Sequence, residues 1–246
     1  MKVIVIIPAA GLGTRMASNS DAVRQKGVPS KQFTELGGTP ILIHTLRKFV
    51  AFRSISDIWI ALRKNEIASF RARLNKETVN QTSIHLVEGG EYRQHSVSKA
   101  LAAFAAEPED IVLVHDAVRP FITGQIIQGV IDGAQKYGAA IAGIPAVDTV
   151  KQVDRTADGA IVTATMPRER LVMAQTPQGF RYDVLKKAFD EANSDGFLGT
   201  DEASLVERSG HEVAVVMGSP RNIKITSPAD LELAEFYLRS EVLSTQ

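Results

Sequence analysis

The sequence predicts an α/β protein in which helices cover both faces of a mostly parallel sheet. The β-branched run Val3–Ile7 is typical of a central parallel strand that is buried on both faces. Strand-like and helix-like segments then alternate as far as residue 145, which indicates parallel strands joined by right-handed crossovers. From residue 146 a different alternation predicts a protruding β-hairpin arm over about 146–170.

The first predicted strand, Val3–Ile7, runs into a glycine-rich loop. Gly11 and Gly13 leave that backbone free to bend and to approach a ligand. Successive N–H groups in such a loop can bind an anion, and Arg15 adds a cation. Met16 replaces the third glycine of a dinucleotide fingerprint, and no Gly-Lys-Ser/Thr of a P-loop follows. On the loop alone, a tight turn without a ligand remains an alternative.

The next elements follow from apolar spacing. The polar stretch 17–30 is expected to form a lid, and Thr39 is expected to cap a helix that has Pro40 as its first residue. Further strands are predicted at 57–62, 83–87, 110–115 and 139–145, and further helices at 65–75, 92–105 and 123–136. Because parallel strands share a carboxyl edge, functional residues are expected where these strands end.

The C-terminal half begins with the predicted arm. Segments 147–153 and 160–166 alternate around a turn-like stretch, 154–159. Because an isolated two-stranded ribbon is marginally stable, the hairpin is expected to pack on this chain or on another subunit. Helices are predicted at 182–193, 200–209 and 228–243, and strands at 211–217 and 222–226. The absence of repeats and linkers predicts a single domain, 1–246.

Composition limits the classes of function. Among 246 residues, 28 Lys and Arg balance 28 Asp and Glu, so no global field attracts nucleic acid or an anionic membrane. The lack of cysteine excludes disulfides, thiol catalysis and cysteine-ligated metals. There is neither a signal-peptide pattern nor an apolar run of membrane-spanning length, and a cytoplasmic location is therefore expected.

Short motifs follow one another from residue 2 to about residue 238. They are Pro8–Met16, Lys31-Gln32, Gly89-Gly90 with Arg93 and Ser96, His115–Pro120, Asp148–Lys151, Arg168, Gln175–Pro177, Thr200–Ser204 and Asn222–Thr226. Together they resemble the 2-C-methyl-D-erythritol 4-phosphate cytidylyltransferase family of the non-mevalonate isoprenoid pathway. The resemblance implies a Rossmann-like fold of the nucleotidyltransferase type. It also implies cytidylyl transfer from CTP to methylerythritol phosphate, with release of pyrophosphate.

The implied reaction is in-line attack of the acceptor phosphate on the α-phosphorus of CTP. A phosphate monoester has its second pKa near ~6, so the nucleophile is already ionised at neutral pH and needs no general base. The reaction needs cations, because negative charges converge and more charge develops on pyrophosphate. By resemblance, Arg15 and Lys31 are these cations, and Mg²⁺ or another divalent cation bridges phosphate oxygens.

The resemblance also assigns the other site residues. The CTP-binding residues are Ala9, Ala10, Gly11, Gly13, Gly90, Glu91 and Ser96. The acceptor-binding residues are Asp116, Arg119, Thr149, Arg168, Thr176, Thr200 and Lys224. The catalytic set is Arg15, Lys31, Asp116 and Lys224. Thr149 and Arg168 are implied to reach across a two-fold axis, which makes the arm the contact of a homodimer.

Several of these residues have structural alternatives. Ser96 is as readily a first-turn hydroxyl of a helix. Asp116 is either a metal ligand or a hydrogen-bond acceptor for substrate, and a buried ion pair with Arg119 remains possible. His115 is expected to be structural. Glu202 is expected in the acidic first turn of a helix that Thr200 caps.

Two other functions remain possible at this stage. A cytidylyltransferase for another polyol phosphate, such as ribitol 5-phosphate, would share the nucleotide-binding motifs. The Pro8-Ala9-Ala10 opening and the stretch Thr200–Ser204 favour methylerythritol phosphate. The other is a nucleotide-binding regulator without activity. The residues Arg15, Lys31, Asp116, Arg168 and Lys224, which are all present, argue against it.

Overall fold

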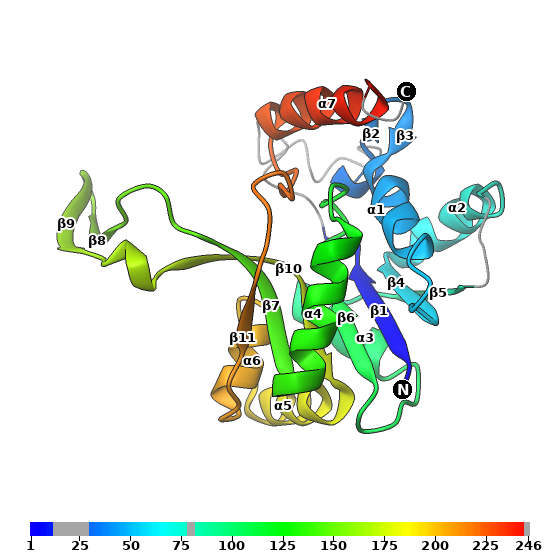
Figure 1. Ribbon diagram of the computed structural model, residues 1–246, viewed down its shortest axis with the longest axis horizontal. Coiled ribbons are helices and arrows are strands. Elements are labelled where there is room, and N and C mark those ends of the chain that lie inside the picture. Colours follow the sequence, from blue (N-terminus) through cyan, green and yellow to red (C-terminus); the bar gives the residue numbers. More distant parts are fainter. Residues whose placement is uncertain (12–29, 78–81, 244–246) are drawn as a thin grey trace.

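The computed structural model describes residues 1–11, 30–77 and 82–243 (Figure 1). Within these ranges, seven strands form one sheet in the order β11-β7-β10-β6-β1-β4-β5. The strands are β1 (Val3–Pro8), β4 (Asp57–Leu62), β5 (Ser83–Glu88), β6 (Ile111–Val114), β7 (Ala139–Pro145), β10 (Val172–Arg181) and β11 (Ala214–Met217). Described neighbours are parallel except where β10 pairs with β6 and β7. The predicted mostly parallel sheet is confirmed.

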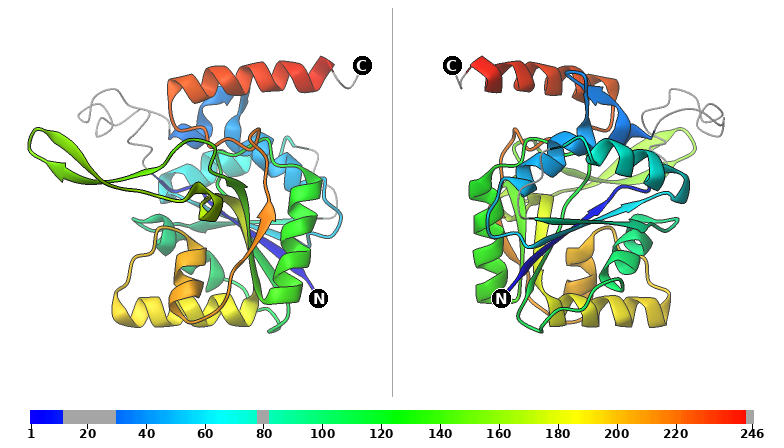
Figure 2. Two further views of the ribbon diagram at one scale, coloured as in Figure 1. Left: turned by 60° about the vertical axis from the view of Figure 1, so that its left-hand side comes forward. Right: turned by 90° about the vertical axis from the view of Figure 1, so that its right-hand side faces the viewer.

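Helices cover both faces of the sheet (Figure 2). They are α1 (Ile41–Val50), α2 (Lys64–Leu74), α3 (Arg93–Leu101), α4 (Gly124–Tyr137), α5 (Tyr182–Asp195), α6 (Glu202–Arg208) and α7 (Pro228–Leu243). Val5 of β1 is buried in the cluster that contains side chains of α1, α2 and α4. Ile6, the next residue, is buried among side chains of α3, α5 and α6. This explains the unbroken apolar run of β1, because both faces of the strand are in the core.

Strand β10 has no counterpart in the prediction from sequence. Its ladder is interrupted at Pro177, which has no N–H to donate, and the register against β7 shifts between Ala174 and Gln178. A Cβ at Gly179 would lie 2.7 Å from a Val130 methyl, so only glycine allows α4 to pack this closely. The insertion of β10 beside β6 places Thr176 next to the end of that strand.

Two predicted elements differ from the structure. The segment 222–226 forms no strand, although Ile225 is fully buried and its N–H donates to the Val118 carbonyl at 3.0 Å. Helix α1 begins at Ile41 with Pro40 as its N-cap, so Thr39 does not cap it. Instead, Thr39–Pro40 (β3) pairs with Glu35–Leu36 (β2) just after a short 3-10 helix, Lys31–Phe33. The chain therefore reverses direction between β2 and β3 before α1 begins at Ile41.

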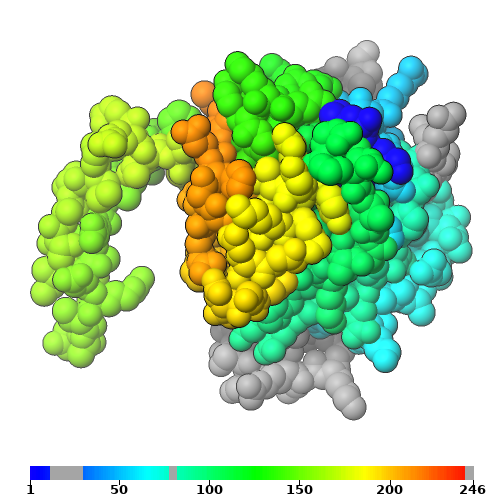
Figure 3. Space-filling view, turned by 90° about the horizontal axis from the view of Figure 1, so that it is seen from below, coloured from blue at the N-terminus to red at the C-terminus, as the bar shows by residue number. Residues whose placement is uncertain are grey.

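The predicted hairpin arm is confirmed. Strands β8 (Lys151–Thr156) and β9 (Gly159–Thr165) form a separate two-stranded sheet. Thr156 pairs with Gly159, so the turn has two residues rather than the six predicted. The arm projects away from the body (Figure 1) and is curved along its length (Figure 3). Its side chains are exposed over most of its length. None of the described helices is long and apolar enough to cross a membrane.

Candidate active site

A cavity of about 230 Å³ lies where strands β1 and β6 end. Its described lining is Pro8, Ala9, Ala10, Gly11, Lys31, Gln32, Arg93, Ser96, Asp116, Ala117, Val118 and Lys224. These residues come from the loops after β1 and β6, the 3-10 helix, the start of α3 and the segment before α7. The sheet therefore gathers motifs that are far apart in the sequence at its carboxyl edge, as expected for ligand sites in such folds.

One buried carboxylate is the electrostatic centre of this cavity. Asp116 Oδ1 accepts from Arg93 Nε at 3.2 Å, and Oδ2 accepts from Arg119 Nε at 3.1 Å and Lys224 Nζ at 2.9 Å. Burial acts to raise the pKa of Asp116, but the cations Arg93, Lys224 and Arg119 outweigh it and hold that pKa well below its ordinary value. Asp116 is therefore ionised at neutral pH and keeps three cations beside the cavity.

A second buried carboxylate belongs to the same network. Arg93 Nη1 donates to both carboxylate oxygens of Glu202 at 2.7 Å, and Glu202 is 1% exposed. Burial acts to lower the pKa of Arg93, yet the attraction of Glu202 and Asp116 raises it above its ordinary value. Arg93 thus bridges two carboxylates. Glu202 is the first residue of α6, but Asp201 caps that helix by accepting from Ser204 N–H at 2.9 Å, so the expectation that Thr200 caps it is wrong.

The buried side chain of His115 supports the Asp116–Arg119 turn through hydrogen bonds of its ring. Its Nε2 lies 3.1 Å from the Arg119 carbonyl, which can only accept, so Nε2 carries the hydrogen. Nδ1 then accepts from the Thr176 hydroxyl at 3.1 Å, and Thr176 Oγ1 itself accepts from Asp116 N–H at 3.0 Å. Burial lowers the pKa of His115 to about 4, so the ring is neutral. The expected structural role of His115 agrees with these contacts.

The depressed pKa of His115 makes stability depend on pH. An unfolded chain protonates this histidine near pH 6.5, whereas the folded chain does so only near pH 4. Stability is therefore lost as the pH falls, by about 3 kcal/mol between these values. We expect this loss in urea unfolding of the unsubstituted chain and of a His85→Gln control, whose ring is partly exposed. His115→Gln should flatten the profile; an unchanged slope would contradict the assignment.

The loop after β1 is held by neighbouring side chains. Gln32 Nε2 donates to the Ala9 carbonyl at 2.5 Å. Ser96 Oγ accepts from Gly90 N–H at 3.0 Å, which ties α3 to the end of β5. An added Cβ at Gly89 would collide with the Cβ of Ala10, so glycine is needed for the two loops to touch. The hydroxyl of Ser96 thus has a structural contact in addition to its place in the cavity lining.

The structure brings only part of the expected set together. The cavity lining contains Ala9, Ala10, Gly11, Lys31, Ser96, Asp116 and Lys224. Three further expected residues do not line the cavity but hydrogen-bond to residues that do. Arg119 and Thr176 bond to Asp116, and Gly90 bonds to Ser96. Thr200 lines an adjacent cavity of about 210 Å³ on the other side of Arg93. Glu91, Thr149 and Arg168 are exposed, the last two at the base of the arm. Gly13, Arg15 and the expected lid, apart from Ser30, lie outside the described residues.

Comparison with known proteins decides the family. A sequence model described as "IspD: 2-C-methyl-D-erythritol 4-phosphate cytidylyltransferase" matches residues 3–240. The chain belongs to this family. A relative from Acidobacterium capsulatum that carries the same enzyme name is 59% identical, covering 97% of this chain and 98% of its own. One from Solibacter usitatus is 53% identical, covering 98% and 97%.

Solved structures of the family agree in fold. The enzyme of this family from Thermus thermophilus aligns with a TM-score of 0.73 at 34% identity, covering 97% of this chain and all of that one. The enzyme from Francisella tularensis aligns with a TM-score of 0.77 at 35% identity, covering 96% and 99%. As a member of the 2-C-methyl-D-erythritol 4-phosphate cytidylyltransferase family, the chain is a nucleotidyltransferase that transfers a cytidylyl group from CTP to methylerythritol phosphate.

Two residues organise this cytidylyltransferase site although the sequence analysis gives neither of them a part in it. Arg93 occurs in a recognised motif, but its two partners are 23 and 109 residues away in sequence. Glu202 is expected from sequence only in a helix turn, and its burial is a tertiary property. The signal for this pair is visible only in the structure, where a buried acidic residue lies beside an arginine of a motif. A buried charge without a partner would be too costly in the core, so this proximity indicates an ion pair.

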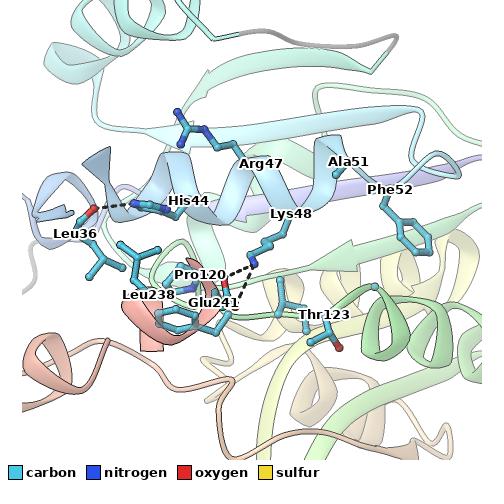
Figure 4. Close-up of a pocket in the computed structure, with 13 residues that line it drawn as sticks. Leu36, His44, Arg47, Lys48, Ala51, Phe52, Pro120, Thr123, Leu238 and Glu241 are labelled. Atoms are coloured by element: carbon cyan, nitrogen blue, oxygen red, sulfur yellow. Dashed lines mark hydrogen bonds and ion pairs between the residues drawn. The ribbon is translucent and has the colours of Figure 1, made fainter. Parts of the chain in front are cut away.

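A larger cavity, of about 580 Å³, lies between α1, the start of α4 and α7 (Figure 4). Its polar groups are already paired within the chain: His44 Nε2 with the Leu36 carbonyl at 2.8 Å, and Lys48 with Glu241 at 3.2 Å. Arg47, which points away from it in Figure 4, pairs with Glu77 at 2.8 Å. None of the cytidylyltransferase site residues expected from the motifs lines it. The smaller cavity is therefore the candidate active site.

Proposed function

We propose that the chain joins CTP to 2-C-methyl-D-erythritol 4-phosphate in the cavity beside Asp116, giving 4-diphosphocytidyl-2-C-methyl-D-erythritol and pyrophosphate. The observation that carries this proposal is the cluster of cations at the end of β6. Arg93, Arg119 and Lys224 outnumber the carboxylates Asp116 and Glu202 by one, and Lys31 adds a further positive charge to the lining. Such an excess suits a reaction that assembles phosphates.

In this proposal the backbone of Ala9–Gly11 and the side chain of Lys31 receive CTP. Lys224 faces the acceptor phosphate, and its side chain is 35% exposed, so it can turn toward a substrate. Asp116 keeps Arg93 and Arg119 as partners when Lys224 moves. The acceptor oxygen attacks the α-phosphorus, its new P–O bond forms, and the bond to pyrophosphate breaks. The ionised acceptor supplies the nucleophile, which agrees with a site where His115 is fully engaged in hydrogen bonds.

A divalent cation is proposed to enter with CTP rather than to reside on the protein. No group of three or more His, Cys, Asp or Glu side chains converges among the described residues. Both oxygens of Asp116 are already paired with cations. The described residues therefore do not fit a resident Mg²⁺ site, and Asp116 would have to release a cation to become a ligand. Mg²⁺ typically binds through substrate phosphates with one or two carboxylates, and would neutralise phosphate charge.

The arm is proposed to complete the acceptor site of a second copy in a homodimer, with the rest of each chain as a single catalytic domain. Two observations support this. Arg168 donates to the Val147 carbonyl at 3.1 Å at the base of the arm, and its side chain is 58% exposed. Ile161 and Val162 on β9 are 63% and 57% exposed, and an isolated ribbon with exposed apolar residues is marginally stable.

The test of the reaction is pyrophosphate release with CTP, Mg²⁺ and methylerythritol phosphate, with ribitol 5-phosphate in a parallel reaction. Turnover with methylerythritol phosphate alone supports the proposal. Turnover only with ribitol 5-phosphate would assign a different acceptor. Binding of CTP without turnover on either acceptor would revive the inactive nucleotide-binding regulator.

Mixing two inactive variants tests the dimer. If Arg168 acts on the partner's site, a hybrid of Lys31→Gln and Arg168→Ala chains contains one intact site. Random mixing should then restore about a quarter of the unsubstituted activity. If Arg168 acts within its own chain, both sites of the hybrid are impaired and mixing restores nothing. Each variant mixed with itself is the control.

A further inference from the structure

We propose that Arg63, the N-cap residue of α2, and Glu66, in the first turn of that helix, are positioning residues that set the two phosphate-binding segments of the cavity in place. The inference rests on the proposed function, because it concerns how that site binds CTP. The two segments are the loop after β1, which ends the first described range at Gly11, and the segment that begins with Ser30 and Lys31.

Arg63 holds the first segment. Its Nε donates to the Ala10 carbonyl at 3.2 Å and its Nη2 donates to the Gly11 carbonyl at 3.0 Å. Arg63 follows β4 directly and is the N-cap residue of α2, so its backbone is anchored at the end of a core strand. The planar guanidinium can engage two adjacent carbonyls at once, which an ammonium group cannot do with the same geometry.

The orientation of these carbonyls matters for anion binding. In a trans peptide the carbonyl and the following N–H point in opposite directions. Arg63 draws the Ala10 carbonyl toward itself, which turns the Gly11 N–H to the other side. Carbonyl oxygens repel phosphate, whereas N–H groups bind it. Since Ala10 and Gly11 line the cavity and Arg63 does not, the contact favours the peptide orientation that suits an anion.

Glu66 holds the second segment. Ser30 Oγ donates to Glu66 Oε1 at 2.5 Å, and Ser30 is buried and directly precedes the cavity residue Lys31. Glu66 Oε2 accepts from Arg63 N–H at 3.4 Å, and the two side chains approach to 4.0 Å. One helical turn therefore contacts the chain on both sides of residues 12–29. Arg63 and Glu66 carry opposite charges, so their joint effect is one of placement rather than of net charge.

The test compares Arg63→Ala and Glu66→Gln with Arg63→Lys and with Arg71→Ala, a control that removes an exposed arginine from the same helix. CTP affinity is measured by titration calorimetry without acceptor, and steady-state kinetics are measured for both substrates. We expect Arg63→Ala to raise the Kd and KM for CTP about tenfold, since two charge-assisted hydrogen bonds are lost. The KM for the acceptor should stay within about twofold, and Arg63→Lys should recover part of the affinity.

A merely structural role for Arg63 would lower the melting temperature and impair both substrates alike, or leave CTP affinity equal to that of Arg71→Ala. Either result overturns the positioning role while the unsubstituted chain still binds CTP and turns over. Failure of the proposed function is distinct, because it would be seen in the unsubstituted chain itself, which would then bind no CTP or bind it without turnover. Glu66→Gln keeps the size of the side chain and is expected to raise the KM for CTP about threefold.

Discussion

Replacing Asp116 with Asn is expected to lower the free energy of unfolding by about 3–5 kcal/mol, because it leaves a buried cation cluster without its carboxylate. Arg93 would keep Glu202, but Arg119 and Lys224 would lose their described acidic partner. Urea unfolding at neutral pH measures the effect. The same substitution at Asp183, whose ion pair with Arg181 is 41% exposed on both sides, is the control and should cost less than about 1 kcal/mol.

The loss of unfolding free energy caused by Asp116→Asn, called the deficit here, has a defined dependence on pH. A carboxylate with a lowered pKa stabilises the fold above its ordinary pKa of 3.8, and this contribution is lost as the pH falls toward the depressed value. The deficit should therefore be the same at about pH 5 and about pH 8, where Asp116 is ionised throughout. A deficit no larger than that of Asp183→Asn, or one that vanishes by pH 5, would contradict the proposed cation cluster.

Replacing Lys31 with Gln is expected to lower kcat about a hundredfold, which corresponds to about 3 kcal/mol of transition-state stabilisation. Lys31 lines the cavity at the segment that follows Ser30, where a cation can face phosphate. Glutamine keeps much of the side-chain length but carries no charge. Single-turnover cytidylyl transfer at saturating CTP measures the step directly.

The matched control for Lys31 is Lys76→Gln, which removes an exposed lysine just after α2. It should leave kcat within about twofold of the unsubstituted value, since exposed charges are screened by solvent. A kcat within about threefold of the unsubstituted value would show that Lys31 does not face the reacting phosphates.

The fold was predictable wherever burial leaves a continuous pattern. Strand β1 lies in the core on both faces, so its apolar run is visible in the sequence. The arm was visible because its exposed strands alternate. Strand β10 was not, because proline and glycine are rare inside strands. Here a register shift accommodates Pro177, and Gly179 allows α4 to pack closely. The error at 222–226 is the reverse case. Ile225 is buried in a cluster that includes Val118, Phe121 and side chains of α7, but its segment joins no strand ladder.

The site was predictable where strands end. Ala9 and Asp116 lie in the cavity because motifs at the carboxyl edge of a parallel sheet converge. Lys31 follows no strand of this sheet and was expected only from the resemblance to the family; it reaches the lining from the 3-10 helix. The ion pair of Asp116 with Arg119, weighed as an alternative, is present, since the two residues share one turn. The bridge from Arg93 to Glu202 could not be predicted, because it depends on how α3 and α6 meet. The partner contacts of Thr149 and Arg168 remain a prediction.

The most direct test of this active-site assignment is a crystal structure of the chain with CTP bound. We expect the triphosphate in the cavity beside Asp116, against the backbone of Ala9–Gly11 and within reach of Lys31. Nucleotide seated instead in the larger cavity between α1, α4 and α7, with its phosphates at Lys48, would contradict the assignment of the active site.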